Sequence, residues 1–242
     1  MQREEKPQPV RGGFKARGSF VVRCESCNLP ALNCLCPYRV SARSRIQVWL
    51  ITHRMEHYKP TNTGRLIGDV LDDTRVFTWH RTEPDAELLA LLDDPRYAPF
   101  VVFPDDQPDY DSGRVVGIDA VTSAQAAGKV AVYILLDGTW RQARRIFRKS
   151  PYLDRLPVLP LRTTRETRYR LRKPASSDHL CTAEVAAELL RQGGDANAAD
   201  VLDDYFDAFN QSYAASRGHR KIDTPGPAMQ RLLARKSPAR SE

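Results

Sequence analysis

The stretch Lys129–Leu136 constrains the fold more than any other part of this chain. After its lysine it reads VAVYILL, an unbroken apolar run with the length of a buried strand. A strand that is apolar on both faces belongs in the middle of a sheet covered on both sides, which is typical of parallel sheets. The run therefore predicts a central strand in a mostly parallel α/β sheet.

Strand-like and helix-like segments alternate along the rest of the chain. We expect strands at 46–52, 74–79, 100–103 and 158–161, and helices at 62–71, 84–94, 140–149, 181–192 and 200–216. Residues 104–128 are acidic and look rich in loops, and residues past Gly218 look like a tail. Aromatic residues recur at helical spacing in the last helix, which indicates core packing. Ligands of such sheets bind beyond the carboxyl ends of strands, so we expect a site at loops 53–64, 104–106 and 137–140.

Four of the five cysteines lie within thirteen residues, as Cys24-x-x-Cys27 and Cys34-x-Cys36. Two thiol pairs on short turns can converge on one tetrahedral metal ion, and zinc is the expected occupant. Disulfides are disfavoured because the first residues contain no apolar segment typical of a secretion signal. A redox dithiol or inert thiols remain alternatives. We expect a zinc knuckle at 21–40, after a disordered basic segment at 1–20.

The positive charge is concentrated in two blocks. Residues 1–45 contain nine Lys/Arg and three Glu, and residues 141–173 contain twelve Lys/Arg and two acids, whereas the whole chain has a net charge of +7. Such blocks favour binding to a polyanion, with nucleic acid as the expected partner. The alternative is solvated helix faces. No apolar run has the length of a membrane span, so we expect a cytoplasmic protein without membrane contact.

Asp137 leaves the end of the predicted central strand, followed by Gly138, Thr139 and Trp140. A carboxylate held at the mouth of a crevice can act as a base. It can equally cap the helix that begins near Thr139. Trp140 can stack on a flat ligand or pack in the core. There is no G-x-G-x-x-G and no G-x-x-x-x-G-K-[ST] sequence, which disfavours a dinucleotide site and a P-loop.

The Asp-Gly-Thr-Trp turn also resembles the signature of the DTW domain family. The resemblance begins with Leu136–Trp140 and the following QARR, and continues through most of the chain from about residue 22 to residue 213. It includes the cysteine knuckle and these further segments: Thr61–Leu66, Val101–Pro104, Arg168–Arg172 and Cys181–Glu184. We therefore expect a catalytic DTW domain at 41–216 and a tail at 217–242.

The resemblance implies a SPOUT-like α/β domain with a C-terminal trefoil knot and S-adenosylmethionine as the donor. Members of the family transfer its 3-amino-3-carboxypropyl group to N3 of a uridine in tRNA, in the variable loop (position 47 in the tRNA convention), and release methylthioadenosine. This implies an enzyme with tRNA as its partner. It implies no obligate protein partner.

The chemistry of this transfer suggests roles for individual residues. Uridine N3 must lose its proton, and we expect Asp137 to be the general base. The expected donor contacts are Thr63, Gly64, Arg65, Phe103, Pro104, Leu136, Gly138, Thr139, Trp140, Cys181, Thr182 and Glu184. The expected contacts to tRNA phosphates are Arg144, Arg145, Arg148, Arg168, Arg170 and Arg172.

Two competing functions remain. The same fold permits methyl transfer, or transfer to another RNA such as ribosomal RNA. A non-catalytic zinc-knuckle RNA-binding module would explain the cysteines and the charge, although it leaves the Asp-Gly-Thr-Trp turn without a role.

Overall fold

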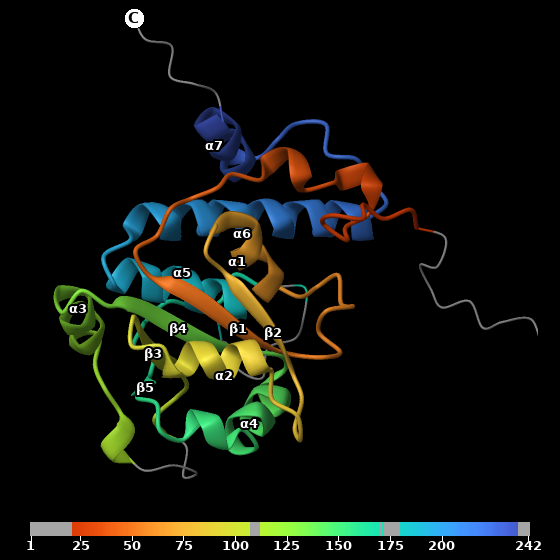
Figure 1. The fold of residues 1–242 in the computed structure, drawn as a ribbon. Coiled ribbons are helices and arrows are strands. Elements are labelled where there is room, and N and C mark those ends of the chain that lie inside the picture. Colours follow the sequence, from red (N-terminus) through yellow and green to blue (C-terminus); the bar gives the residue numbers. More distant parts are fainter. Residues whose placement is uncertain (1–20, 107–111, 170, 172–179, 237–242) are drawn as a thin grey trace, which may run out of the picture.

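The computed structural model describes residues 21–106, 112–169, 171 and 180–236. Its sheet has five parallel strands in the order β2-β1-β4-β3-β5 (Figure 1). The strands are β1 (Gln47–His53), β2 (Arg75–Trp79), β3 (Tyr97–Val102), β4 (Val130–Asp137) and β5 (Val158–Leu159). The apolar run that predicted a central strand is β4, so this expectation is confirmed.

Helices cover both faces of the sheet. In Figure 1, α1, α5 and α6 lie over one face, and α2 and α4 lie over the other. The α-helices are α1 (Gly64–Val70), α2 (Ala86–Asp93), α3 (Asp119–Ala126), α4 (Trp140–Arg148), α5 (Thr182–Gln192), α6 (Ala196–Arg217) and α7 (Pro227–Lys236). Single 3-10 turns are η1 (Ala31–Asn33), η2 (Cys36–Tyr38), η3 (Ser112–Arg114) and η4 (Pro151–Leu153).

Alternation along β4 divides the core into two layers. Tyr133 and Leu135 pack with the buried side chains of α1, α5 and α6, whereas Val132 and Ile134 pack with those of α2 and α4. Successive side chains of a strand point to opposite faces, so a strand that is apolar throughout contributes to both layers. The Tyr133 hydroxyl donates to the Leu189 carbonyl at 3.1 Å, which satisfies its polar atom inside the first layer.

The strand order creates a crevice between β1 and β4. The chain leaves β1 toward β2 on one side of the sheet, and leaves β4 toward β5 on the other. Thr52 of β1 is in register with Asp137 at the end of β4. Loops that depart in opposite directions from neighbouring parallel strands leave a ligand site between them. Asp137 therefore stands at the topological switch point of the sheet.

Two regions that were expected to be irregular each contain a helix, and the expectation of a C-terminal tail was wrong. The acidic stretch 104–128 contains α3, whose one buried residue, Val121, gives too weak an apolar period to reveal a helix. The expected C-terminal tail contains α7, which buries Ala228, Met229 and Leu232. In Figure 1, α7 lies above α6, on the side away from the sheet. A third difference is small: α2 is capped by Asp85, not begun by Pro84.

The cysteine knuckle packs against the C-terminal half of α6. Asn33 donates to the Ser216 hydroxyl at 3.0 Å and to the Arg220 carbonyl at 2.8 Å, and it accepts from the Ile222 amide at 2.9 Å. Cys27, Leu29 and Leu35 are fully buried and join the core layer of α6. The knuckle is thus continuous with the main core.

None of the helices in the described ranges is both long enough and apolar enough to cross a bilayer. The longest, α6, combines buried Tyr205, Phe206 and Phe209 with a row of four aspartates at positions 200, 203, 204 and 207. The predicted core role of its aromatic residues is confirmed.

The packing of α7 can be tested with two substitutions on the same helix. We expect Met229→Ala to lower the free energy of unfolding by about 2–5 kcal/mol, because a fully buried side chain leaves a cavity. Leu233 is 38% exposed, so Leu233→Ala should have a much smaller effect. Urea unfolding of both variants measures this. Equal and negligible effects would mean that the C-terminal residues act as a tail after all.

Candidate active site and metal-binding knuckle

A cleft of about 890 Å³ opens at the carboxyl edge of the sheet. Its walls come from the loops that follow β1, β3, β4 and β5 and from the start of α5. Of the expected donor contacts, the cleft is lined by Thr63, Phe103, Pro104, Leu136, Gly138, Thr139, Trp140, Cys181 and Thr182. The volume falls in the usual range of small-molecule sites, about 300–1,000 Å³.

Asp137 lies at the base of this cleft with its carboxylate held from two sides. Its Oδ2 accepts from Nδ2 of Asn62 at 2.6 Å, and its Oδ1 accepts from Oγ1 of Thr182 at 2.8 Å. Asp137 is 3% exposed. A carboxylate bound through both oxygens has one orientation, which is what positioned acid–base chemistry requires.

The first turn of α1 is built around this carboxylate. Oδ1 of Asn62 accepts from the amide of Arg65 at 2.9 Å, so Asn62 connects the helix backbone to Asp137. Gly64 has no side chain where the carboxyl group lies. A Cβ at that position would stand 2.7–2.8 Å from the carboxyl atoms of Asp137. The missing side chain at Gly64 therefore lets α1 lie close to Asp137. Gly64 itself does not line the cleft.

Thr139, not Asp137, caps α4. Its hydroxyl accepts from the Gln142 amide at 3.4 Å, and Gln142 Oε1 accepts from the Thr139 amide at 2.8 Å, which forms a capping box. A Cβ on Gly138 would stand 2.9 Å from the Gln142 side chain, so the turn needs glycine. The alternative that Asp137 serves as the helix cap is thereby excluded.

One wall of the cleft is aromatic. Phe103 stacks on Trp140 with ring centroids 5.4 Å apart and on Phe147 with centroids 4.1 Å apart. Trp140 is half-buried and lines the cleft. The Trp140 ring therefore packs against Phe103 and also faces the cleft. It combines the two roles, core packing and ligand stacking, that the sequence analysis left open.

Segment 160–169 also lines the cleft, and nothing in the sequence pattern indicated this role. Residues 160–163, Thr167 and Tyr169 line the cleft. The Tyr169 hydroxyl donates to the Thr61 carbonyl at 2.6 Å, which connects this segment to the loop after β1. Irregular segments have no periodicity, so their place in a site is seen only once the fold is known.

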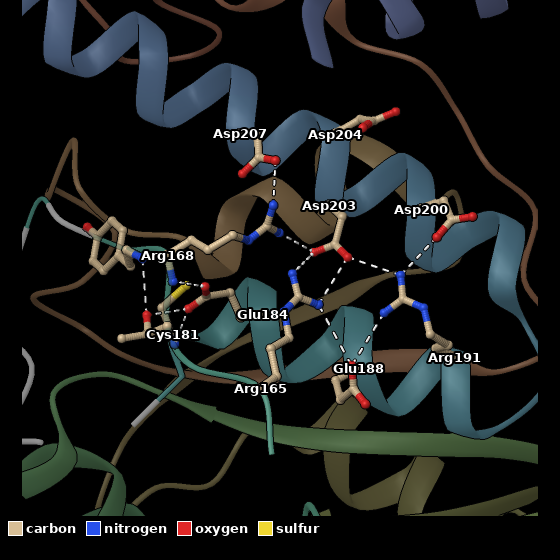
Figure 2. Close-up of polar contacts among 12 residues, drawn as sticks. Arg165, Arg168, Cys181, Glu184, Glu188, Arg191, Asp200, Asp203, Asp204 and Asp207 are labelled. Carbon is tan, nitrogen blue, oxygen red and sulfur yellow. Dashed lines mark hydrogen bonds and ion pairs between the residues drawn. The ribbon is translucent and has the colours of Figure 1, made fainter. Parts of the chain in front are cut away.

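Glu184 holds this segment in place. Its carboxylate accepts from the Thr167 hydroxyl at 2.7 Å and from the amides of Arg168 at 2.7 Å and Cys181 at 3.0 Å (Figure 2). It is fully buried and does not line the cleft. Burial, with Glu184 acting in the same direction, raises the pKa of the Cys181 thiol. The thiol is therefore neutral at pH 7, which disfavours a nucleophilic role.

Arg65 also lies outside the cleft lining. Its guanidinium lies over the ring of Phe209 on α6, 5.8 Å from the centroid. The structure thus separates three of the twelve expected donor contacts, Gly64, Arg65 and Glu184, from the nine that line the cleft.

The expected tRNA-binding arginines fall into two groups. Arg144, Arg145 and Arg148 lie on α4, where Arg145 and Arg148 are exposed and Arg144 is half-buried. Arg168 lies against α6, with ion pairs to Asp203 at 2.8 Å and to Asp207. Positions 170 and 172, the two remaining expected contacts, lie outside the described residues.

Four arginines of the second basic block form ion pairs within the fold. Figure 2 shows Arg165, Arg168 and Arg191 converging on Asp203, at 2.6, 2.8 and 3.0 Å. Arg162 likewise pairs with Asp105, and Arg155 with Asp93. The block predicted an RNA-binding surface, but Arg155, Arg162, Arg165 and Arg168 connect segment 155–168 to acidic residues elsewhere in the fold, whereas Arg191 belongs to α5.

The four knuckle thiols converge as the cysteine spacing predicted. Their sulfur atoms all lie within 4.8 Å of one another, with Cys24 and Cys36 at 3.6 Å and Cys27 and Cys34 at 3.7 Å. Four thiolates at the Zn–S distance of a tetrahedral site are about 3.8 Å apart. The Leu35 amide donates to the Cys27 sulfur at 3.4 Å, and such hydrogen bonds orient the ligands of metal sites. The group fits a metal ion.

Three related proteins share the name tRNA-uridine aminocarboxypropyltransferase 2. The 177 residues that match the protein of Drosophila melanogaster are 27% identical and cover 69% of this chain and 65% of that protein. The proteins from Macaca fascicularis and Mus musculus are 27% and 29% identical, with 69% of this chain and 55% of each protein covered. The chain thus spans between half and two thirds of these relatives. No solved structure matches it.

The match to a family model is more extensive. The model of the DTW domain aligns with residues 21–214, which include the knuckle, the cleft and most of α6. The chain therefore belongs to the DTW domain family.

Proposed function

We propose that this protein transfers the 3-amino-3-carboxypropyl group of S-adenosylmethionine to N3 of a uridine in tRNA, at position 47 in the tRNA convention. The names of the related proteins support the reaction class. The observation that supports the site most strongly is the rigidly held Asp137 at the base of a cleft at the sheet's switch point.

The reaction requires one proton transfer and one displacement. Asp137 accepts the N3 proton, and the nitrogen lone pair attacks the sulfonium-bound carbon of the aminocarboxypropyl arm. The new N–C bond forms as the C–S bond breaks, and methylthioadenosine leaves as a neutral thioether. Asp137 supplies the base and the walls supply orientation, which decides which of the sulfonium carbons reacts.

The lining residues suggest how the donor lies. Phe103, Pro104 and Leu136 form an apolar wall suited to adenine. Thr63 and Thr182 stand at the starts of α1 and α5, where the Thr63 hydroxyl and backbone amides suit the donor's carboxylate, while the Thr182 hydroxyl is used by Asp137. Trp140 is the aromatic residue nearest to Asp137 in the sequence. Its ring is suited to stacking on a uridine that has left the base stack of the tRNA.

The exposed face of α4 is the proposed contact for tRNA phosphates. Arg145 and Arg148 are exposed there, on the helix that begins with the cleft residue Trp140. The loop after β1 adds Tyr58, which is 78% exposed, and the exposed Arg54. Arginines with an exposed aromatic ring match the chemistry of an unpaired RNA segment.

We also propose that the knuckle holds zinc and that the chain is knotted near its C-terminus. The sulfur geometry and the four-thiol donor set support zinc. The knot is implied by the family resemblance.

The proposed reaction is tested with Asp137→Asn. The asparagine oxygen can accept from Asn62 while its amide donates to the Thr182 hydroxyl, so fold and donor binding should persist. We expect the rate of transfer to fall by about 10²–10⁴-fold, the usual contribution of a positioned base. Mass spectrometry of tRNA nucleosides measures the product. Raising the pH should partly restore the rate, because N3 then ionises without help. A parental rate at neutral pH would contradict the assignment.

Gly64 offers a test of the close approach of α1 to Asp137. Gly64→Ala should displace the carboxylate and lower the rate by about a hundredfold, the cost of a displacement of about 1 Å. Gly68→Ala is the matched control on the same helix, because its added Cβ would meet Thr74 at an ordinary 3.8 Å. The two rates should differ widely. If both variants keep the parental rate, the close approach does not matter for catalysis.

The phosphate contacts are tested by salt dependence. Replacing Arg145 and Arg148 with alanine should weaken tRNA binding and reduce the slope of log K against log salt concentration by about one for each arginine replaced. Arg168→Ala should leave that slope unchanged and instead lower stability, because Arg168 is paired with Asp203 and Asp207. A slope reduced by Arg168→Ala and not by the α4 double variant would move the RNA surface to α6.

Metal analysis tests the zinc assignment. We expect one zinc per chain, and none in the Cys24→Ser, Cys27→Ser double variant. Cys181→Ser is the control, since the fifth cysteine lies outside the cluster. If the parent protein contains no zinc after purification from cells grown in zinc-containing medium, the assignment is contradicted.

A further inference from the structure

The chain turns directly after α6, and this turn is held against the knuckle. Asn33 of the knuckle, which is 5% exposed, donates to the Arg220 carbonyl at 2.8 Å and accepts from the Ile222 amide at 2.9 Å. The Arg220 amide donates to the Ala215 carbonyl at 3.0 Å, one of the hydrogen bonds that end the helix. Both backbone groups of Arg220 are therefore bound, so its side chain leaves the protein from a fixed position.

The basic turn (residues 217–221) and the knuckle carry exposed positive charge. Four exposed cations belong to one or the other: Arg217, Arg220, Lys221 and Arg23. None of them forms an ion pair in the part of the chain that the structure describes. Residues 21–39 and 216–223 contain two acids, Glu25 and Asp223, so basic side chains outnumber acidic ones here.

The acidic row of α6 does not reach this turn. Asp203 and Asp204 pair with the basic side chains near them, as in the ion pair of Arg231 with Asp204 at 2.6 Å. The helix contains no acid after Asp207, so the basic turn has no counter-charge on the end of α6. Exposed cations without partners favour the binding of a polyanion. The alternative is solvated surface charge, and the place of the turn in the fold favours the first interpretation.

The basic turn lies on the side of the molecule where the cleft opens. In Figure 1, the C-terminal end of α6, the knuckle and the loop after β1 all lie to the right, with the carboxyl ends of the strands. That loop carries the exposed Arg54 and Tyr58. The match to the DTW domain ends at residue 214, so the turn adds a surface beyond the matched region. An RNA bound at the loop after β1 can extend along this side to the basic turn.

We propose that the basic turn, with the knuckle that holds it, is a second contact for the phosphate backbone of tRNA, separate from α4. Arg220 and Lys221 bind phosphates there. Such contacts position an RNA and increase its affinity, and they carry no sequence information. The partner in this inference rests on the proposed function, because the RNA substrate is the polyanion that reaches this side. The contact itself takes no part in the transfer reaction.

The salt dependence of tRNA binding tests this proposal in the full-length protein. We expect the Arg220→Ala, Lys221→Ala double variant to weaken binding and to reduce the slope of log K against log salt concentration by about two, one for each cation. Arg217 stays in place because a cation in the last turn of α6 also stabilises the helix. The matched control is Arg43→Ala, Lys129→Ala, which removes two exposed cations that precede β1 and β4, at the opposite edge of the sheet. The slope of this control should stay parental.

Kinetics and stability separate an RNA contact from structural support of the knuckle. The Arg220→Ala, Lys221→Ala variant should have a higher KM for tRNA, with the kcat, metal content and unfolding midpoint of the parent. A parental salt slope in this variant, or an equal loss of slope in the control, would overturn the proposal. So would a loss of metal or stability that accounts for the weaker binding. A parent that binds tRNA through the basic turn but transfers nothing would contradict only the proposed reaction, and a parent that binds no tRNA would contradict both.

Discussion

The hydrogen bonds to the Asp137 carboxylate are the interaction on which the arrangement of the cleft depends. Asn62 precedes α1 and Thr182 begins α5, so one carboxylate joins two helices that are far apart in sequence. Both helices cover the same face of the sheet (Figure 1). The absence of a side chain at Gly64 lets α1 approach closely enough for this contact. Asp137 is therefore both the proposed base and the point that aligns the walls around it.

A second set of charged groups holds segment 160–169, which lines the cleft. Arg165 and Arg168 pair with Asp203 of α6, and Glu184 binds the backbone and hydroxyl of the same segment (Figure 2). These groups are partly buried, where ion pairs are screened less than at a surface. The arginine-rich sequence thus has two physical roles. Its α4 part remains exposed, and its later part fastens segment 160–169 beside the cleft.

Much of the fold could be predicted from the sequence because regular elements have periodic patterns. The central strand, the parallel sheet and the cysteine cluster followed from local residue spacing, and the cleft followed from strand ends. Helix α3 was missed because it buries a single valine, and α7 because its short apolar face follows a glycine-containing break. Arg65 and Glu184 were expected to contact the donor because they belong to sequence segments, 61–66 and 181–184, whose other residues were expected to bind it. Sequence adjacency does not reveal which face of a helix a side chain occupies, and both point away from the cleft lining.

The proposed reaction has one defining feature: the cleft organised by Asp137 directs the aminocarboxypropyl arm of the donor, and not its methyl group, to tRNA. The most direct measurement uses two preparations of S-adenosylmethionine, labelled in the carboxyl carbon or in the methyl carbon, each incubated with the pure protein and tRNA. We expect the carboxyl label to enter tRNA and the methyl label to leave in methylthioadenosine. Methyl label in tRNA with S-adenosylhomocysteine as the product, or no label in tRNA from either donor, would contradict the proposed reaction.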